Sequence, residues 1–121
     1  MDKSKNSKRF DLEDRCFEFA KTVRTFIKKL PKNLQNIEDA KQLVRSSGSV
    51  GANYIEANES LTKKDFVYRI RISRKEAKET IYWLKLVDCG GEGVVDELRY
   101  NLVREATELM KIMSAIMRKS V

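Results

Sequence analysis

Apolar residues recur every three or four positions in four separate segments of the chain, the spacing that places side chains on one face of an α-helix. The first segment begins after Asp11, a suitable helix N-cap, and ends at Pro31, which disfavours helical geometry in the residue before it. The other segments predict helices over residues 36–58, 62–87 and 95–119. Four amphipathic helices joined by short loops predict an all-α fold, an up-down-up-down antiparallel four-helix bundle.

The second segment contains a run of small residues, at positions 46–51, that admits two interpretations. Glycine inside a helix costs about 1 kcal/mol relative to alanine, so the run is consistent with a loop. Val44, Gly48 and Ile55 nevertheless keep the helical phase across it, which favours one continuous helix. In that case the small side chains allow a neighbouring helix to approach closely.

The chain has 121 residues, which fits one domain, and its five glycines and single proline disfavour a turn-rich β-sandwich or barrel. We expect a disordered basic tail over residues 1–9 and the bundle domain over residues 10–121. No segment has the composition of a signal peptide or the roughly 18–20 apolar residues of a membrane span. Cys16 and Cys89 fit two free thiols in a cytoplasmic protein, although the sequence also permits a disulfide between them.

The sequence contains no histidine, which removes the usual catalytic base near neutral pH and any histidine ligand for a metal. The glycine-rich residues 90–93 lack the lysine and the preceding strand of a phosphate-binding loop and indicate an interhelical turn. We therefore predict no catalytic residue, no cofactor and no bound metal. Glu76 and Glu79, on adjacent helical turns, leave a metal-dependent nuclease as a minor alternative.

A polar row in each of the two central helices predicts a contact between them. If these helices form a hairpin that turns near residues 59–62, positions whose numbers sum to about 122 lie side by side. Arg45 then lies near Glu76 or Glu79, and Glu56 lies near Arg69. We interpret these rows as a structural polar network that fixes the helix register or a subunit contact, formed by Arg45, Asn53, Glu56, Glu76 and Glu79.

Positive charge concentrates in the third predicted helix of a chain whose net charge is +7. Six cations can share one outward arc of this helix: Lys64, Arg71, Arg74, Lys75, Lys78 and Lys85. Together with the basic tail they suit the phosphates of RNA or DNA, and Tyr68, Tyr82 and Trp83 lie near enough to stack on unpaired bases. The alternative is a solvated helix face whose aromatic side chains are buried in the core or in a subunit contact.

Two stretches resemble the bacterial four-helix bundle family, also called the 23S rRNA intervening-sequence protein family after members encoded within insertions in 23S rRNA genes. They are RSSGSVGANYIEANES (residues 45–60) and KKDFVYRIRISRKEAKETIYWLKLV (residues 63–87). The matching features are the SxGANYxEA core at 49–57, Phe66, the KEAxET block at 75–80 and YWL at 82–84. With the flanking helices, the resemblance covers about residues 10–118.

This resemblance implies a four-helix bundle that assembles into a ring-like homopentamer with a central channel, and it supplies no enzyme activity. The chain is also similar, more distantly, to the accessory variability proteins of diversity-generating retroelements, basic pentameric bundles thought to bind nucleic acid. We therefore predict a non-enzymatic oligomer that binds RNA or DNA through phosphate contacts, with no membrane and no small-molecule substrate as partner. The alternative is an assembly or scaffold protein that acts through protein–protein contacts without binding nucleic acid.

Overall fold

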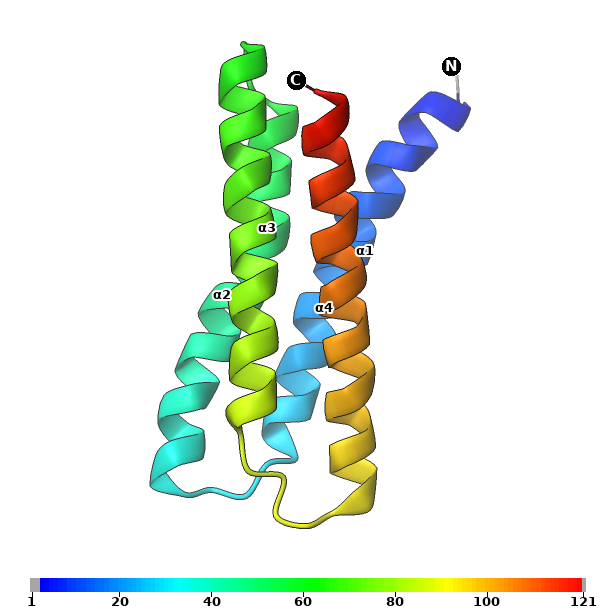
Figure 1. The fold of residues 1–121 in the computed structure, drawn as a ribbon. Coiled ribbons are helices and arrows are strands. Elements are labelled where there is room, and N and C mark those ends of the chain that lie inside the picture. The colour runs from blue at the N-terminus through cyan, green and yellow to red at the C-terminus, as the bar shows by residue number, and fades with distance from the viewer. Residues whose placement is uncertain (1–2, 121) are drawn as a thin grey trace.

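In the computed structural model, four long helices form an antiparallel bundle, which confirms the predicted all-α architecture (Figure 1). The structure describes the backbone of residues 3–120 and the side chains of residues 11–120, and the described backbone contains no strand. Each helix packs against two neighbours, α1 on α2 and α4, and α3 on the same two helices. The helices are α1 (Lys3–Lys28), α2 (Leu34–Asn58), α3 (Lys63–Leu86) and α4 (Gly93–Lys119).

The start of the first helix differs from the prediction. α1 begins at Lys3 rather than near Asp11, so the helix extends into residues 3–9. Each residue added to an existing helix gains one backbone hydrogen bond, and residues 3–10 contain neither proline nor glycine to stop that propagation. The side chains of the predicted basic tail lie outside the described residues, so its role in binding stays a prediction.

The second helix is continuous through the small-residue run at 46–51, so the loop interpretation is wrong. Its first turn is capped by Asn33, whose side-chain oxygen accepts a hydrogen bond from the backbone N–H of Asn36 at 2.8 Å. The third helix is also capped, because Thr62 Oγ1 accepts a hydrogen bond from the backbone N–H of Asp65 at 3.1 Å. Both caps satisfy N–H groups that have no partner within the helix.

Small side chains let the helices of the bundle approach one another closely, as the sequence predicted. A Cβ atom placed on Gly51 of α2 would lie 3.0 Å from Cys16 Cβ on α1. Between α2 and α3, the fully buried Ser73 donates a hydrogen bond to the carbonyl of Val50 at 2.7 Å. Short polar side chains thus fill the α2–α3 contact, and no buried side-chain N or O atom among the described residues lacks a hydrogen-bond partner.

The loops at one end of the bundle are joined by Asn36, which is 3% exposed. Its amide nitrogen donates to the carbonyls of Pro31 at 2.9 Å and Asp88 at 2.8 Å, and its oxygen accepts from the Asp88 N–H at 3.0 Å. Gly90 follows with φ +70°, where a side chain would be strained and where a Cβ would lie 2.6 Å from Pro31. These contacts tie the α1–α2 loop to the α3–α4 loop.

Candidate nucleic-acid interface

An ion pair between α2 and α3 occupies the position predicted for the polar network. Arg45 Nη1 lies 2.7 Å from Glu76 Oε2, and Arg45 Nη2 lies 3.0 Å from Glu79 Oε2. The Glu76 side chain is only 7% exposed, whereas that of Arg45 is 51% exposed. The hydrogen bonds from Arg45 to Glu79 and to Glu76 raise the pKa of the guanidinium. One arginine therefore bridges both carboxylates at the α2–α3 contact.

The remaining members of the predicted network are arranged differently. Arg69 Nη1 donates to Asn53 Oδ1 at 3.3 Å, and Asn53 in turn donates to the carbonyl of Ser49 at 2.9 Å. Glu56 is exposed and forms no ion pair with a described residue, so the expected Glu56–Arg69 contact is wrong. The positions of Asn53 and Arg69 sum to 122, the register expected for the hairpin. The predicted register of the α2–α3 hairpin is therefore confirmed. Glu56 lies almost one turn too far along α2 to contact Arg69.

The chemistry of Glu76 and Glu79 is that of a structural ion pair. A guanidinium already contacts an oxygen of each carboxylate, and this contact competes with a metal ion for the same lone pairs. Among the described residues, no group of three or more cysteine or carboxylate side chains is placed to ligate one ion. The geometry at this position is that of an ion pair that fixes the register of α2 against α3.

The six cations predicted for nucleic-acid contact are all exposed on α3. Lys64, Arg71, Lys78 and Lys85 are spaced seven residues apart, and this spacing keeps them within about 20° of one another from one step to the next on a helix of 3.6 residues per turn. Glu76 lies about 200° from Lys78 around the same helix, and it faces α2. Glu76 thus lies on the opposite side of α3 from Lys78, whereas Glu79 lies about 40° from Lys75 and borders the cations.

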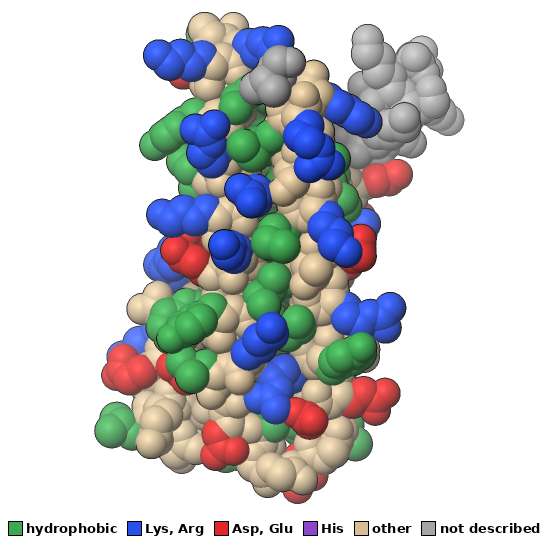
Figure 2. Space-filling model, in the orientation of Figure 1, with side chains coloured by type: hydrophobic (Ala, Val, Ile, Leu, Met, Phe, Trp, Pro, Cys, Tyr) green, Lys and Arg blue, Asp and Glu red, His purple; other side chains and the backbone are tan. Residues whose placement is uncertain are grey.

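A second row of cations, which the sequence analysis missed, lies on α4. Arg104, Lys111 and Arg118 are exposed and are also spaced seven residues apart. Figure 2 shows Lys and Arg side chains along both α3 and α4 on the same side of the molecule, with apolar side chains between them. The repeated spacing was the available sequence signal, but only packing shows that the two rows flank one surface. We call this surface the basic face, and define it as Lys64, Arg71, Arg74, Lys75, Lys78, Lys85, Arg104, Lys111 and Arg118.

Exposed tyrosine rings accompany these rows. Tyr68 and Tyr82 on α3 are 57% and 60% exposed, and Tyr100 on α4 is 63% exposed. The Arg104 guanidinium lies 5.9 Å from the centroid of the Tyr100 ring. Trp83 is half-buried against the core, in an edge-to-face contact with Tyr82 at 5.0 Å between centroids. Tyr82 is therefore an open ring, Trp83 is largely a core residue, and Tyr100 is an aromatic position that the sequence analysis missed.

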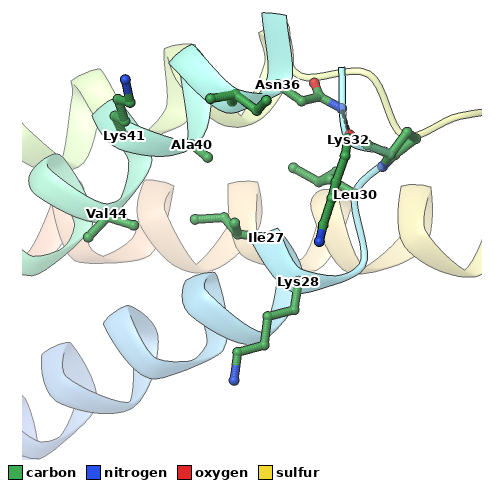
Figure 3. A pocket seen from close by; sticks show the side chains of 10 residues that line it. Ile27, Lys28, Leu30, Lys32, Asn36, Ala40, Lys41 and Val44 are labelled. Atoms are coloured by element: carbon green, nitrogen blue, oxygen red, sulfur yellow. Dashed lines mark hydrogen bonds between the residues drawn. The ribbon is translucent and has the colours of Figure 1, made fainter. Parts of the chain in front are cut away.

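The side of the bundle formed by α1 and α2 carries an apolar groove of about 660 Å³. Figure 3 shows that the space is surrounded by Ile27, Leu30, Ala40 and Val44. The amino groups of Lys28 and Lys41, at its border, point away from it. On α2, Ile37 is 50% exposed along the same groove. This groove is apolar, unlike the basic face. An apolar groove of this kind favours a protein as its binding partner over a polyanion.

Both cysteines are buried free thiols, as the sequence favoured. Burial raises the pKa of the Cys16 thiol to about 12, which keeps it neutral and unreactive at physiological pH. Burial also raises the pKa of Cys89. Within the described residues, no helix combines the length and the apolar composition needed to cross a bilayer.

Comparisons with known proteins agree with this architecture. A family model described as 23S rRNA-intervening sequence protein matches residues 8–115. A crystal structure of a protein of unknown function from the S23 ribosomal protein family of Bacteroides thetaiotaomicron is 31% identical to this chain, with a TM-score of 0.74. The match covers 88% of this chain and 97% of that protein. No curated protein matches the sequence.

Proposed function

The chain belongs to the 23S rRNA-intervening sequence protein family, and from this premise we propose that it is a non-enzymatic, oligomeric cytoplasmic protein that binds RNA or DNA through its basic face. The observation that carries the proposal is the pair of cation rows on α3 and α4. All nine cations of the basic face are exposed, and none forms an ion pair with a described residue. Unpaired surface cations exchange their counterions for phosphates at little energetic cost, which favours a polyanionic partner.

The spacing of the cations supports contact with a phosphate backbone rather than recognition of base sequence. Seven residues of helix rise by about 10.5 Å, so each row presents a charge at regular intervals along the bundle. As far as the structure describes them, the two cation rows contain lysine and arginine without the asparagine or glutamine that pairs with an adenine edge in a major groove. The proposed binding is therefore weakly dependent on sequence and strongly dependent on salt.

Fluorescence anisotropy with a labelled hairpin RNA and a labelled duplex DNA, over about 50–300 mM salt, tests this proposal. The triple variant Arg71→Gln/Lys78→Gln/Arg104→Gln removes three charges from the basic face, and we expect it to weaken binding at least tenfold. It should also reduce the slope of log K against log salt by about 2–3. Each phosphate contact releases about 0.7–0.9 counterions, and the variant loses three such contacts.

A matched control removes the same three charges from the other side of the bundle, as Lys28→Gln/Lys32→Gln/Lys41→Gln. These lysines border the α1–α2 groove, so the control should bind within about twofold of the unmodified protein. Equal losses in both variants would show that net charge, and not the basic face, drives association. If neither nucleic acid binds at about 50 mM salt, the proposed function is rejected.

A scaffold role without nucleic acid is the second candidate, and the apolar α1–α2 groove favours it. Val44 and Ile37 are partly exposed on the α2 wall of the groove, and covering such residues is the usual driving force of protein association. We propose that the occupant is a second copy of this chain. The basic face would then remain open in the assembled protein.

Native mass spectrometry tests the assembly. A homopentamer, as the family resemblance implies, has a mass of about 70 kDa, five times 14.1 kDa. Val44→Lys places a charge at the apolar groove and should dissociate the oligomer, whereas Lys41→Gln at the border should leave it intact. An unchanged mass for Val44→Lys would assign the subunit contact to another surface.

A further inference from the structure

We propose that the basic face binds single-stranded rather than duplex nucleic acid, with phosphates on the cation rows and unpaired bases stacked on Tyr68, Tyr82 and Tyr100. This inference rests on the proposed function and names its substrate class. It is carried by the placement of three exposed tyrosines beside the cations. Phosphate binding alone does not require them.

The tyrosines on α3 continue the heptad arrangement of the cations. Tyr68, Lys75 and Tyr82 are spaced seven residues apart and form a row beside the one that contains Arg71 and Lys78. All three side chains of this row are exposed. An aromatic ring, a cation and a second aromatic ring thus alternate along one surface of the helix, and the neighbouring row supplies the phosphate contacts.

The third ring, Tyr100, lies on α4, the other helix of the basic face. Arg99 of α4 donates a hydrogen bond to the carbonyl of Val87 at 2.7 Å, so the start of α4 is level with the end of α3. Tyr100 and Tyr82 are close in sequence to these two contact points and therefore occupy the same end of the helix pair. Tyr100 is exposed beside Arg104, the first cation of the α4 row. Rings on both helices accordingly flank this end of the basic face.

These three rings are largely exposed. Tyr68, Tyr82 and Tyr100 leave between 57% and 63% of their surface open, although the bundle holds Tyr54 at 6%. Arg69 lies over the Tyr68 ring, 6.0 Å from its centroid, and Trp83 and Tyr82 meet in an edge-to-face contact. Each ring keeps more than half of its surface open to a partner.

Duplex and single-stranded nucleic acids use such a surface differently. In a duplex the base faces are stacked inside the helix, so tyrosines at the surface gain nothing beyond phosphate contact. In a single strand each base offers a free face, and stacking on an aromatic ring stabilises the complex with little dependence on sequence. Tyr68 and Tyr82 are separated by 14 residues, about 21 Å along α3, which matches about six nucleotides stacked at 3.4 Å. The combination of cation rows and open rings therefore favours an unpaired strand.

The decisive experiment compares labelled 12-nucleotide strands, in RNA and in DNA form, with the same sequences annealed to their complements. We expect the single strands to bind the unmodified protein at least tenfold more tightly than the duplexes at about 100 mM salt. Tyr82→Ala and Tyr100→Ala should each weaken single-strand binding about tenfold, in line with the loss of one stacked base. Duplex binding should change by less than twofold.

Two controls separate stacking from other effects. Tyr82→Phe keeps the ring and should bind within twofold of the unmodified protein, and circular dichroism establishes that the exposed alanine variants remain folded. An abasic strand of equal length keeps the phosphates and should bind Tyr82→Ala and the unmodified protein equally.

The outcomes distinguish the two proposals. If duplexes bind as tightly as single strands, or if Tyr82→Ala weakens both forms equally, single-strand recognition is wrong while phosphate binding by the basic face survives. If no strand binds at about 50 mM salt, the proposed function itself fails. Selective loss of single-strand affinity in the alanine variants supports both.

Discussion

Replacement of Arg45 with methionine removes the guanidinium that pairs with Glu76 and Glu79 while keeping a side chain of similar length. Loss of one partner from a fully buried ion pair costs about 3–5 kcal/mol, and a surface pair contributes about 0–1 kcal/mol. This contact lies between those limits, because the Glu76 side chain is 7% exposed and that of Arg45 is half exposed. We therefore expect Arg45→Met to lower the free energy of unfolding by about 2 kcal/mol.

The expected change in melting temperature follows from the size of the chain. The entropy of unfolding is about 2.1 cal/mol/K per residue, or about 0.25 kcal/mol/K for 121 residues. A loss of about 2 kcal/mol then corresponds to a fall of about 8 °C. Glu79→Gln removes only the more exposed partner, whose side chain is 37% exposed, and should lower the melting temperature by about 2 °C.

Thermal and urea unfolding, followed by circular dichroism at one protein concentration, measure these differences. A double-mutant cycle of Arg45→Met and Glu76→Gln should give a coupling energy of about 1–2 kcal/mol, because the charge-assisted hydrogen bond exists only when both partners are present. A coupling energy near zero, or equal small effects of Arg45→Met and Glu79→Gln, would refute the reasoning that burial of Glu76 makes this pair structural. Native mass measured on the same samples shows whether the contact also supports the oligomer.

Further changes test the packing, the loop contacts and the buried thiol. Gly51→Ala should destabilise the protein by about 1 kcal/mol because its methyl group would crowd Cys16, whereas Gly48→Ala, with only an arginine side chain 3.9 Å away, should be neutral or stabilising in urea unfolding. Asn36→Ala should cost about 2–3 kcal/mol by the same measurement, because three hydrogen bonds at the loop end are lost. Above about pH 9 the Cys16 thiol ionises in the unfolded chain but stays neutral in the folded one up to about pH 12, so stability falls by up to about 1.4 kcal/mol per pH unit. Cys16→Ala should remove that part of the slope in unfolding midpoints measured from pH 8 to 10, and an unchanged slope would contradict the assigned pKa.

Much of the candidate site follows from local sequence patterns. The helical phase of Val44, Gly48 and Ile55 was sufficient to predict a continuous α2 through its glycines, which the structure confirms. The hairpin register was sufficient to bring Arg45 to Glu76 and Glu79, because two antiparallel helices joined by a short turn have few ways to align. The exposure of the α3 cations was also predictable from the sequence, because a helix that buries one face presents the other to water.

The partners of individual side chains were harder to predict. Glu56 and Asn53 lie within one turn of each other on α2, and an arginine side chain is long enough to reach either of two such positions from α3. Sequence spacing does not resolve that difference, whereas the final helix rotation does. The contact of Arg69 with Asn53 therefore emerged only from the packed structure.

The sequence by itself determined the four helices and the charge carried by α3, because these depend on residues within a few positions of one another. Tertiary structure alone decided that the cation row of α4 shares a surface with the cations of α3 (Figure 2). It also decided that the apolar groove forms between α1 and α2, away from this surface. The physical reason is that a helix pattern fixes which face of each helix is polar, but only the packing of helices distant in sequence fixes which polar faces become neighbours.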